Sequence, residues 1–166
     1  LSTAQLDALD TAQLAALTSR QIAALSTAQF ASLQADELAA LGTAQYVAMT
    51  TAQLAALTTD QAAAQQSADV AALSVAQLRA LTPDTIAHLS ESAIAGLTTQ
   101  QAGALTNAQL AQMSEAQIAA METRDIAALG LPQVAALSLA QLQALDSAQL
   151  GALTSRQVGV LTTAQI

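Results

Sequence analysis

Large apolar side chains occupy two positions in every eight along the whole 166-residue chain. With the unit written as positions a to h from Leu1, position a is Leu in 17 of 21 copies, Met in three, and Gln only at Gln65. Position f is nearly as regular, because only Ala62 and Ala102 lack a larger side chain. The register runs to Ile166 without insertion or deletion, so the chain is one tandem array of an octad that reads Leu-Ser/Thr-Thr-Ala-Gln-Leu-Ala-Ala.

An eight-residue period does not fit a straight helix, a coiled coil or a strand. An α-helix turns about 100° per residue, so each octad would rotate the apolar stripe by about 80° around the helix. A coiled coil needs apolar spacing near 3.5 or about 3.67 residues, whereas an octad over two turns gives about 4.0. Positions a and f have opposite parity, and Ala and Gln are poor strand formers, which argues against a β-solenoid. The backbone is therefore expected to bend once in each octad.

The residues at positions b and e mark where each bend falls. Position b is Ser or Thr in 14 copies, and position e, three residues later, is Gln or Glu in 17. Such pairs form a capping box at the start of a helix, and twelve copies carry both halves in phase, for example Thr50 with Gln53. Both prolines, Pro83 and Pro132, fall in the first helical turn, which tolerates proline. Each octad is therefore predicted to hold a helix of about seven residues, from position c to the next position a.

Helices this short need to pack against their neighbours, because isolated helices below about 12 residues are marginal in water. Positions f and a lie on one helix face and are expected to build a continuous Leu/Ile spine, with Ser, Thr and Gln on the surface. The sequence thus predicts an all-α repeat solenoid, or superhelix, of short helices of about two turns, one per 8-residue repeat. Residues 1–166 form a single octapeptide-repeat array, which we expect to be an excerpt of a longer array, since it starts and stops inside the pattern. The handedness and the number of octads per turn do not follow from the sequence.

The pattern is weakest between residues 57 and 96. Ala62 and Gln65 weaken the two apolar positions, and Gln66 replaces a capping residue. Position e also loses its Gln at Thr85 and Ala93. We expect this to be the softest part of the array. Two interpretations stay open, namely a hinge or docking notch and tolerated drift of the repeat.

Composition narrows the choice of partners. The formal net charge is −8, and the four basic residues are all Arg, which argues against nucleic acid and against anionic membrane surfaces. The chain has no cysteine, so disulfides and thiolate metal sites are excluded. Polar residues interrupt nearly every octad, so the uninterrupted apolar runs are far shorter than the roughly 20 residues that a membrane-spanning helix needs. We therefore expect no nucleic-acid partner and no transmembrane segment.

Few residues suggest chemistry. His88 is the only histidine, and no partner can be named for a metal site or a catalytic dyad. Asp36 and Glu37 form a carboxylate pair, but their position at a predicted helix start is explained by capping and the helix dipole. The sequence therefore predicts no catalytic, cofactor-binding or metal-binding residue, no cofactor, and no enzyme activity.

The segment Thr-Thr-Ala-Gln-Leu-Ala-Ala-Leu at residues 50–57 has near copies throughout the chain. It resembles the octapeptide tandem-repeat arrays of very large bacterial surface or secreted proteins, some of which are labelled as adhesion or haem-utilisation proteins. The resemblance covers the whole chain and implies a class of repeat and an extracellular or cell-surface location in a bacterium. It implies no activity and no functional residue.

Two classes of function remain in competition. The unvarying register and the lack of any chemical constellation favour a structural segment, serving as a stalk, spacer or filament. The alternative is a binding or adhesion module whose elongated face recognises a protein, a glycan or a regular surface. The expected contacts are those between neighbouring repeats, with end-to-end or lateral self-association as a further expectation, because the apolar spine would be uncovered at both ends.

Overall fold

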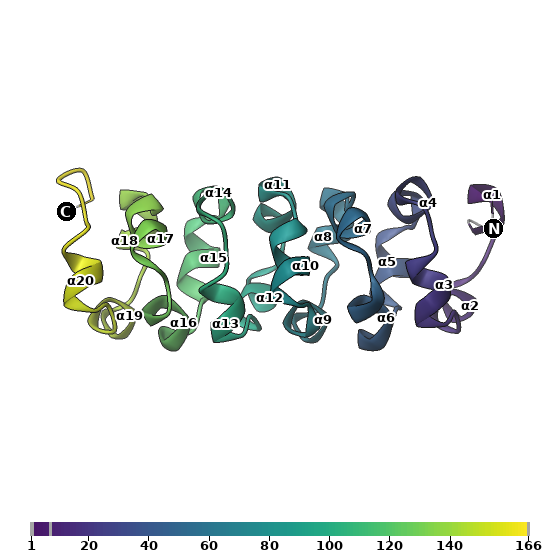
Figure 1. Cartoon of the computed structure of the whole chain (residues 1–166), viewed down its shortest axis with the longest axis horizontal. Coiled ribbons are helices and arrows are strands. Elements are labelled where there is room, and N and C mark those ends of the chain that lie inside the picture. Colours follow the sequence, from purple (N-terminus) through teal and green to yellow (C-terminus); the bar gives the residue numbers. More distant parts are fainter. Residues whose placement is uncertain (1, 7, 166) are drawn as a thin grey trace.

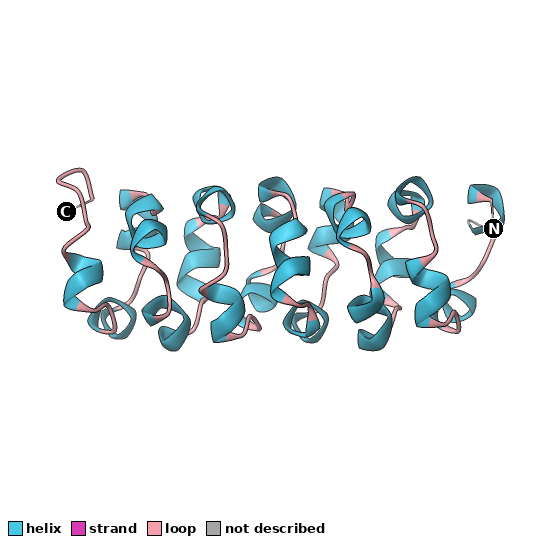
Figure 2. Cartoon of the chain, in the orientation of Figure 1, coloured by secondary structure: helices cyan, strands magenta, loops and turns pink. Residues whose placement is uncertain are grey.

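The computed structural model describes residues 2–6 and 8–165, and these form a single row of short helices without any strand (Figures 1 and 2). The two termini lie at opposite ends of the row (Figure 1). The predicted all-α repeat solenoid, with one helix per octad, is confirmed. In chain order the helices of this described part are α1 (Thr3–Leu6), α2 (Thr11–Ala15), α3 (Ser19–Ala23), α4 (Thr27–Ser32), α5 (Ala35–Ala39), α6 (Thr43–Ala48), α7 (Thr51–Ala55), α8 (Thr59–Ala63), α9 (Ser67–Ala72), α10 (Val75–Ala80), α11 (Pro83–Ala87), α12 (Glu91–Ala95), α13 (Thr99–Ala102), α14 (Asn107–Gln112), α15 (Glu115–Ala120), α16 (Thr123–Ala127), α17 (Leu131–Ala136), α18 (Leu139–Gln143), α19 (Ser147–Gly151) and α20 (Ser155–Val158).

Each helix starts where the capping pattern predicts. The position b residue before α7, Thr50, has extended backbone angles of φ −77° and ψ 156°. Its N–H donates to Gln53 Oε1 at 2.8 Å, and the Gln53 N–H donates to Thr50 Oγ1 at 3.2 Å. Asp10 and Asp146 form the same reciprocal pair with the Gln three residues later. The N-terminal N–H groups that a helix cannot satisfy internally are thus capped from within the same octad.

The helices end earlier than predicted, after four to six residues instead of about seven. After α10, for example, Leu81 at position a is extended, with φ −60° and ψ 133°. Its N–H still donates to Leu78 O at 3.2 Å, which closes a tight final turn. The expectation that position a is the last helical residue was therefore wrong. Position a is where the chain changes direction, and its extended backbone turns the carbonyl away from the helix that it follows.

The row of helices winds as a superhelix. Each helix from α1 to α17 contacts the helix three further along the chain. Side-chain hydrogen bonds described below join residues 28 to 31 apart, which reach from each helix to the fourth one before it. One superhelical turn therefore takes between three and four octads, a number that the sequence did not reveal. In Figure 1, α4, α11 and α14 accordingly lie along one edge of the row, and α6, α9 and α16 lie along the other.

The core is the predicted spine of positions a and f. Leu14, Phe30, Leu78 and Ile118 at position f are all 0% exposed, and the position a residues between Leu25 and Leu145 are buried beside them. The expected Ser/Thr/Gln surface is only partly correct. Most position b hydroxyl residues are exposed, but the Gln residues at position e are buried from the sixth octad onward. None of the described helices is long and apolar enough to cross a membrane.

The lower local stability expected for residues 57–96 stays a prediction. Ala62 is fully buried, and Gln65 is 6% exposed with its Nε2 donating to Gln61 O at 2.8 Å, so both exceptions sit inside the core while filling it less well. We expect amides in α8 to α12 to exchange with solvent at least about fivefold faster than those in α14 to α18, because local opening is easier where fewer large side chains pack. Hydrogen exchange followed by mass spectrometry measures this ratio, and uniform protection along the array would contradict it.

Candidate functional site

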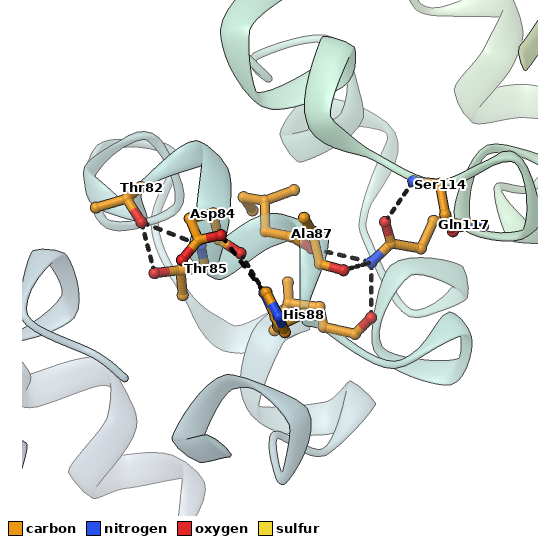
Figure 3. A network of polar contacts seen from close by, with 9 residues as sticks. Thr82, Asp84, Thr85, Ala87, His88, Ser114 and Gln117 are labelled. Atoms are coloured by element: carbon orange, nitrogen blue, oxygen red, sulfur yellow. Dashed lines mark hydrogen bonds and ion pairs between the residues drawn. The ribbon is translucent and has the colours of Figure 1, made fainter. Parts of the chain in front are cut away.

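The residues that first suggest chemistry make only local contacts. His88 Nδ1 lies 2.8 Å from Asp84 O and 3.8 Å from Asp84 Oδ1 within the same helical turn, and both side chains are exposed (Figure 3). In the carboxylate pair, Glu37 Oε2 accepts from the N–H of Gln34 at 2.7 Å, which is the predicted capping role. No group of three or more His, Cys, Asp or Glu residues gathers anywhere in residues 2–6 and 8–165.

The most regular constellation is instead formed by the buried glutamines of position e. Gln53 is 1% exposed, and its Oε1 caps the start of its own helix at Thr50. The Nε2 of the same amide donates to Ile22 O at 2.8 Å and to Leu25 O at 2.9 Å. These carbonyls belong to the end of α3, in the preceding turn of the superhelix. One side chain therefore joins the start of one helix to the end of another.

This bridge recurs along the array, and we call it the glutamine ladder. In every member the Nε2 donates to the position a carbonyl 28 residues earlier, at 2.7 to 2.9 Å, and also reaches a carbonyl 30 or 31 residues earlier. Figure 3 shows one member, Gln117, between the N–H of Ser114 and the carbonyl of Ala87. The members found in the described residues are Gln45, Gln53, Gln61, Gln77, Gln101, Gln109, Gln117, Gln133, Gln141, Gln149, Gln157 and Gln165.

The chemistry of the primary amide explains the choice of residue. It carries one acceptor oxygen and a donor NH₂ group, so it satisfies a helix N-terminal N–H and helix C-terminal carbonyls at once. Glu would form the capping box equally well, but it has no donor and would bury a charge. This second role of Gln was not predicted from the sequence, and the expectation that Gln lies on the surface was wrong for these residues. A signal was present, because position e holds Gln sixteen times and Glu only once, although a capping box accepts either.

Two buried aspartates replace ladder glutamines. Asp69 is 4% exposed and its Oδ1 accepts from Thr43 Oγ1 at 3.0 Å, while Asp125 is 0% exposed and its Oδ1 accepts from Thr99 Oγ1 at 2.8 Å. In both cases the threonine stands 26 residues earlier, on the adjacent turn. Burial raises the pKa of both carboxyl groups, and the threonine hydrogen bond opposes that shift only in part.

Other side chains take over part of the missing amide contacts next to Asp69. A ladder glutamine at this position would donate to Leu41 O, 28 residues earlier, and to the carbonyl of Leu38 or Ala39, on the preceding turn. Tyr46 OH donates to Leu38 O at 3.1 Å, and Gln66 Nε2 donates to Ala39 O at 3.2 Å. Gln66, which the sequence marked as a lost cap, therefore compensates in part for the loss of Gln at position e. Asp125 has a further defect, because its Oδ2 is buried without a hydrogen-bond partner.

A charge placed in the ladder tests its importance. Gln109→Glu removes the donor to Leu78 O and Leu81 O and buries a carboxylate between turns. We expect it to lower the free energy of unfolding by about 3 kcal/mol, because a buried group that loses its partner costs more than a lost surface contact. The control is Gln5→Glu, at an exposed position e that keeps its capping bond, where the change should stay within about 0.5 kcal/mol. Denaturant titration of both variants measures the difference, and equal losses would contradict the ladder.

Completing the ladder should stabilise the chain. Asp125→Gln supplies a donor for the carbonyls of Ile94 and Leu97 on the preceding turn and removes the unpartnered Oδ2. Gln53 already tolerates a threonine at the place equivalent to Thr99, namely Thr27, so the larger side chain fits there. The expected gain is about 1–2 kcal/mol in the free energy of unfolding.

The matched comparison is Asp69→Gln, which should gain less, because Tyr46 and Gln66 already donate to Leu38 O and Ala39 O, so that the new amide adds only the bond to Leu41 O. Thermal and denaturant unfolding rank the two variants. A larger gain at Asp69 than at Asp125 would show that Tyr46 and Gln66 do not replace the missing amide contacts.

Comparison with known proteins places these observations in one repeat family. No curated protein matches the chain. The family model of the ALTTAQ repeat matches residues 1–27, 30–65, 118–155 and 134–166. The matches leave out residues 66–117, which contain three of the four position e exceptions to Gln and Glu, at Asp69, Thr85 and Ala93. Since the matched stretches cover more than half of the sequence, the chain belongs to the ALTTAQ repeat family.

Proposed function

We propose that this repeat array is a structural segment, serving as a stalk, spacer or filament of a bacterial extracellular or surface protein. The observation that carries the proposal is the glutamine ladder. Its amide joins successive turns at the same 28-residue spacing from Gln45 to Gln165. An array whose turns are joined mostly in one way extends by addition of similar units, and its length is then a matter of copy number.

The exposed surface supports a spacer more than a binding module. Recognition surfaces concentrate aromatic and Arg side chains. Here Phe30 and Tyr46 are buried at 0% and 1% exposure, and the arginines are scattered over four separate octads. A repeat family and an all-helical array likewise favour a non-catalytic role. The alternative function is recognition of a protein, glycan or regular surface along the elongated face.

Exchange of the outer surface distinguishes the two functions. In a variant, positions c, d, g and h of octads 13 to 16 (residues 97–128) take the consensus residues Thr, Ala, Ala and Ala, while a, b, e and f stay unchanged. A spacer should keep its length in small-angle X-ray scattering and should complement loss of the native segment in the source cells. A binding module should keep its length and fail to complement. The second outcome would contradict the structural role and favour recognition.

Self-association of the chain is a second part of the proposal. Leu150 and Val158 occupy position f near the last helices and are 44% and 50% exposed, whereas position f is buried in the middle of the array. At the other end of the described chain, Gln13 and Gln21 hold exposed position e amides. A second copy stacked on α19 and α20 would cover the apolar side chains and offer amides to the carbonyls there, as the ladder does within one chain.

Light scattering tests this stacking on the 166-residue chain. We expect the mean molecular mass of the native chain to rise with protein concentration. The variant Leu150→Glu/Val158→Glu should have the mass of a monomer, because two charges would be buried in an apolar contact. Leu131→Glu, a change at an exposed leucine of position c that does not line the apolar hollow around Leu150, is the control that should leave end-to-end association intact. A strict monomer at high concentration would contradict the proposal.

The proposed location outside the cell rests on the resemblance to repeats of surface and secreted proteins. Protease treatment of intact cells tests it, because only an exposed segment would be digested.

A further inference from the structure

The two buried aspartates form the same joint twice. Asp69 in α9 accepts from Thr43 in α6, and Asp125 in α16 accepts from Thr99 in α13. The aspartates stand at position e of the ninth and the sixteenth octad, which places them close to two superhelical turns apart. Figure 1 accordingly shows α9 and α16 along the same edge of the row. We call these the α6–α9 joint and the α13–α16 joint.

In most other octads, position e supplies a hydrogen-bond donor to the preceding turn. Ladder glutamines present an NH₂ group between turns, and an ionised carboxylate presents none. Asp125 shows the consequence, since its Oδ2 is buried without a partner. A protonated carboxyl group regains a donor and loses its charge, so it is the state of aspartate that most resembles the glutamine it replaces.

We propose that the α6–α9 and α13–α16 joints are strengthened by acid: each takes up a proton at Asp69 or Asp125, which turns a buried carboxylate into a neutral donor and holds neighbouring turns together more firmly. The effect is a property of the fold and does not depend on whether the array acts as a spacer or as a binding module.

The surroundings of Asp125 contain few charges that would oppose protonation. On its own helix, Arg124 Nε lies 3.9 Å from Asp125 Oδ1, but Arg124 is 67% exposed and also pairs with Glu122. Of the helices packed against α16, α13 has no ionisable residue, and α19 has only its N-cap, Asp146. Burial and then the charge of Glu122 raise the pKa of Asp125, while the Thr99 hydrogen bond and the exposed Arg124 charge oppose that shift.

Asp69 has an equally acidic neighbourhood. Tyr46 on α6 is buried, and burial and then the charge of Asp69 raise the pKa of its phenol, so it remains neutral. Helix α12, which also packs on α9, contributes the acidic Glu91, and no basic residue lies on α6, α9 or α12. Neither joint therefore has a buried cation that would hold its carboxyl group ionised.

The direction of the pH dependence follows from burial. Burial raises the pKa of Asp69 and Asp125 in the folded chain above the unfolded value of about 3.9. The folded chain then binds more protons than the unfolded chain, so stability rises as the pH falls through the folded pKa values. The gain is complete below the unfolded value.

The test compares two double variants of the full chain that change the net charge equally. Asp69→Asn/Asp125→Asn makes both joints permanently neutral, whereas Asp36→Asn/Asp60→Asn alters two exposed carboxylates. Hydrogen-exchange protection is measured at about pH 7.5 and about pH 5 and corrected for intrinsic exchange.

In the native chain and in the exposed-site variant, we expect amides of α13 and α16 to be at least about twofold better protected at the lower pH, because proton uptake at Asp125 stabilises the folded chain there. The joint variant should lose this difference and be as well protected at both pH values as the native chain is in acid. Persistence of the difference in the joint variant, or its loss in the exposed-site variant, would overturn the proposal.

A second measurement does not depend on variants that fold. The side-chain carboxyl carbon of Asp125, followed by NMR during a pH titration of the native chain, should titrate above the value for an exposed aspartate. Titration of Asp125 at or below about 3.9 would rule out proton uptake at the α13–α16 joint.

Discussion

The architecture depends on one side chain that offers an acceptor and a donor a few bonds apart. A helix of five residues leaves most of its N–H and C=O groups without internal partners, so an array of such helices is a fold made largely of helix ends. Local hydroxyl caps satisfy the start of each helix but cannot reach the end of another. The amide of position e does both, because its oxygen stays with its own helix while its nitrogen reaches carbonyls of the preceding turn.

The direction of these bonds explains why so much of the surface is free to vary. Ladder glutamines bind backbone carbonyls, which every residue has, so the contact does not depend on which side chain occupies the receiving octad. Gln109 donates to Leu78 O and Leu81 O, and Gln141 donates to Leu110 O and Met113 O, with the same geometry. Positions c, d, g and h can then change from Thr or Ala to Pro83, Arg79 or His88 without breaking the link between turns.

The octad register, the caps and the apolar spine were predictable, because they are local or follow from which residues must be buried. Thr50 and Gln53 predict a helix start within a single octad, and the large apolar residues at positions a and f predict the core. The winding was not predictable, since the number of octads per turn depends on the angle at position a, where residues such as Leu81 become extended. The second role of Gln was missed for a similar reason. Its acceptors lie on the preceding turn of the superhelix, far away in the sequence, and only the near absence of Glu at position e hints at them.

The aspartate joints differ from the ladder because they require a particular side chain on the other turn. Asp69 and Asp125 each meet a threonine hydroxyl 26 residues earlier, whereas a ladder amide would accept any octad. If the pairing of turns shifted by one octad, Asp125 would face Glu91 or Asn107 in place of Thr99, and Asp69 would face Ala35 or Thr51 in place of Thr43. Burying Asp125 against Glu91 would place two like charges together in a poorly solvated interface. In a chain of nearly identical repeats, Asp125 is therefore one of the few contacts that distinguish the correct register from both neighbours, whereas Asp69 disfavours only the shift to Ala35, since Thr51 is again a threonine. The specificity of Asp125 accompanies a local loss of hydrogen bonding at its Oδ2.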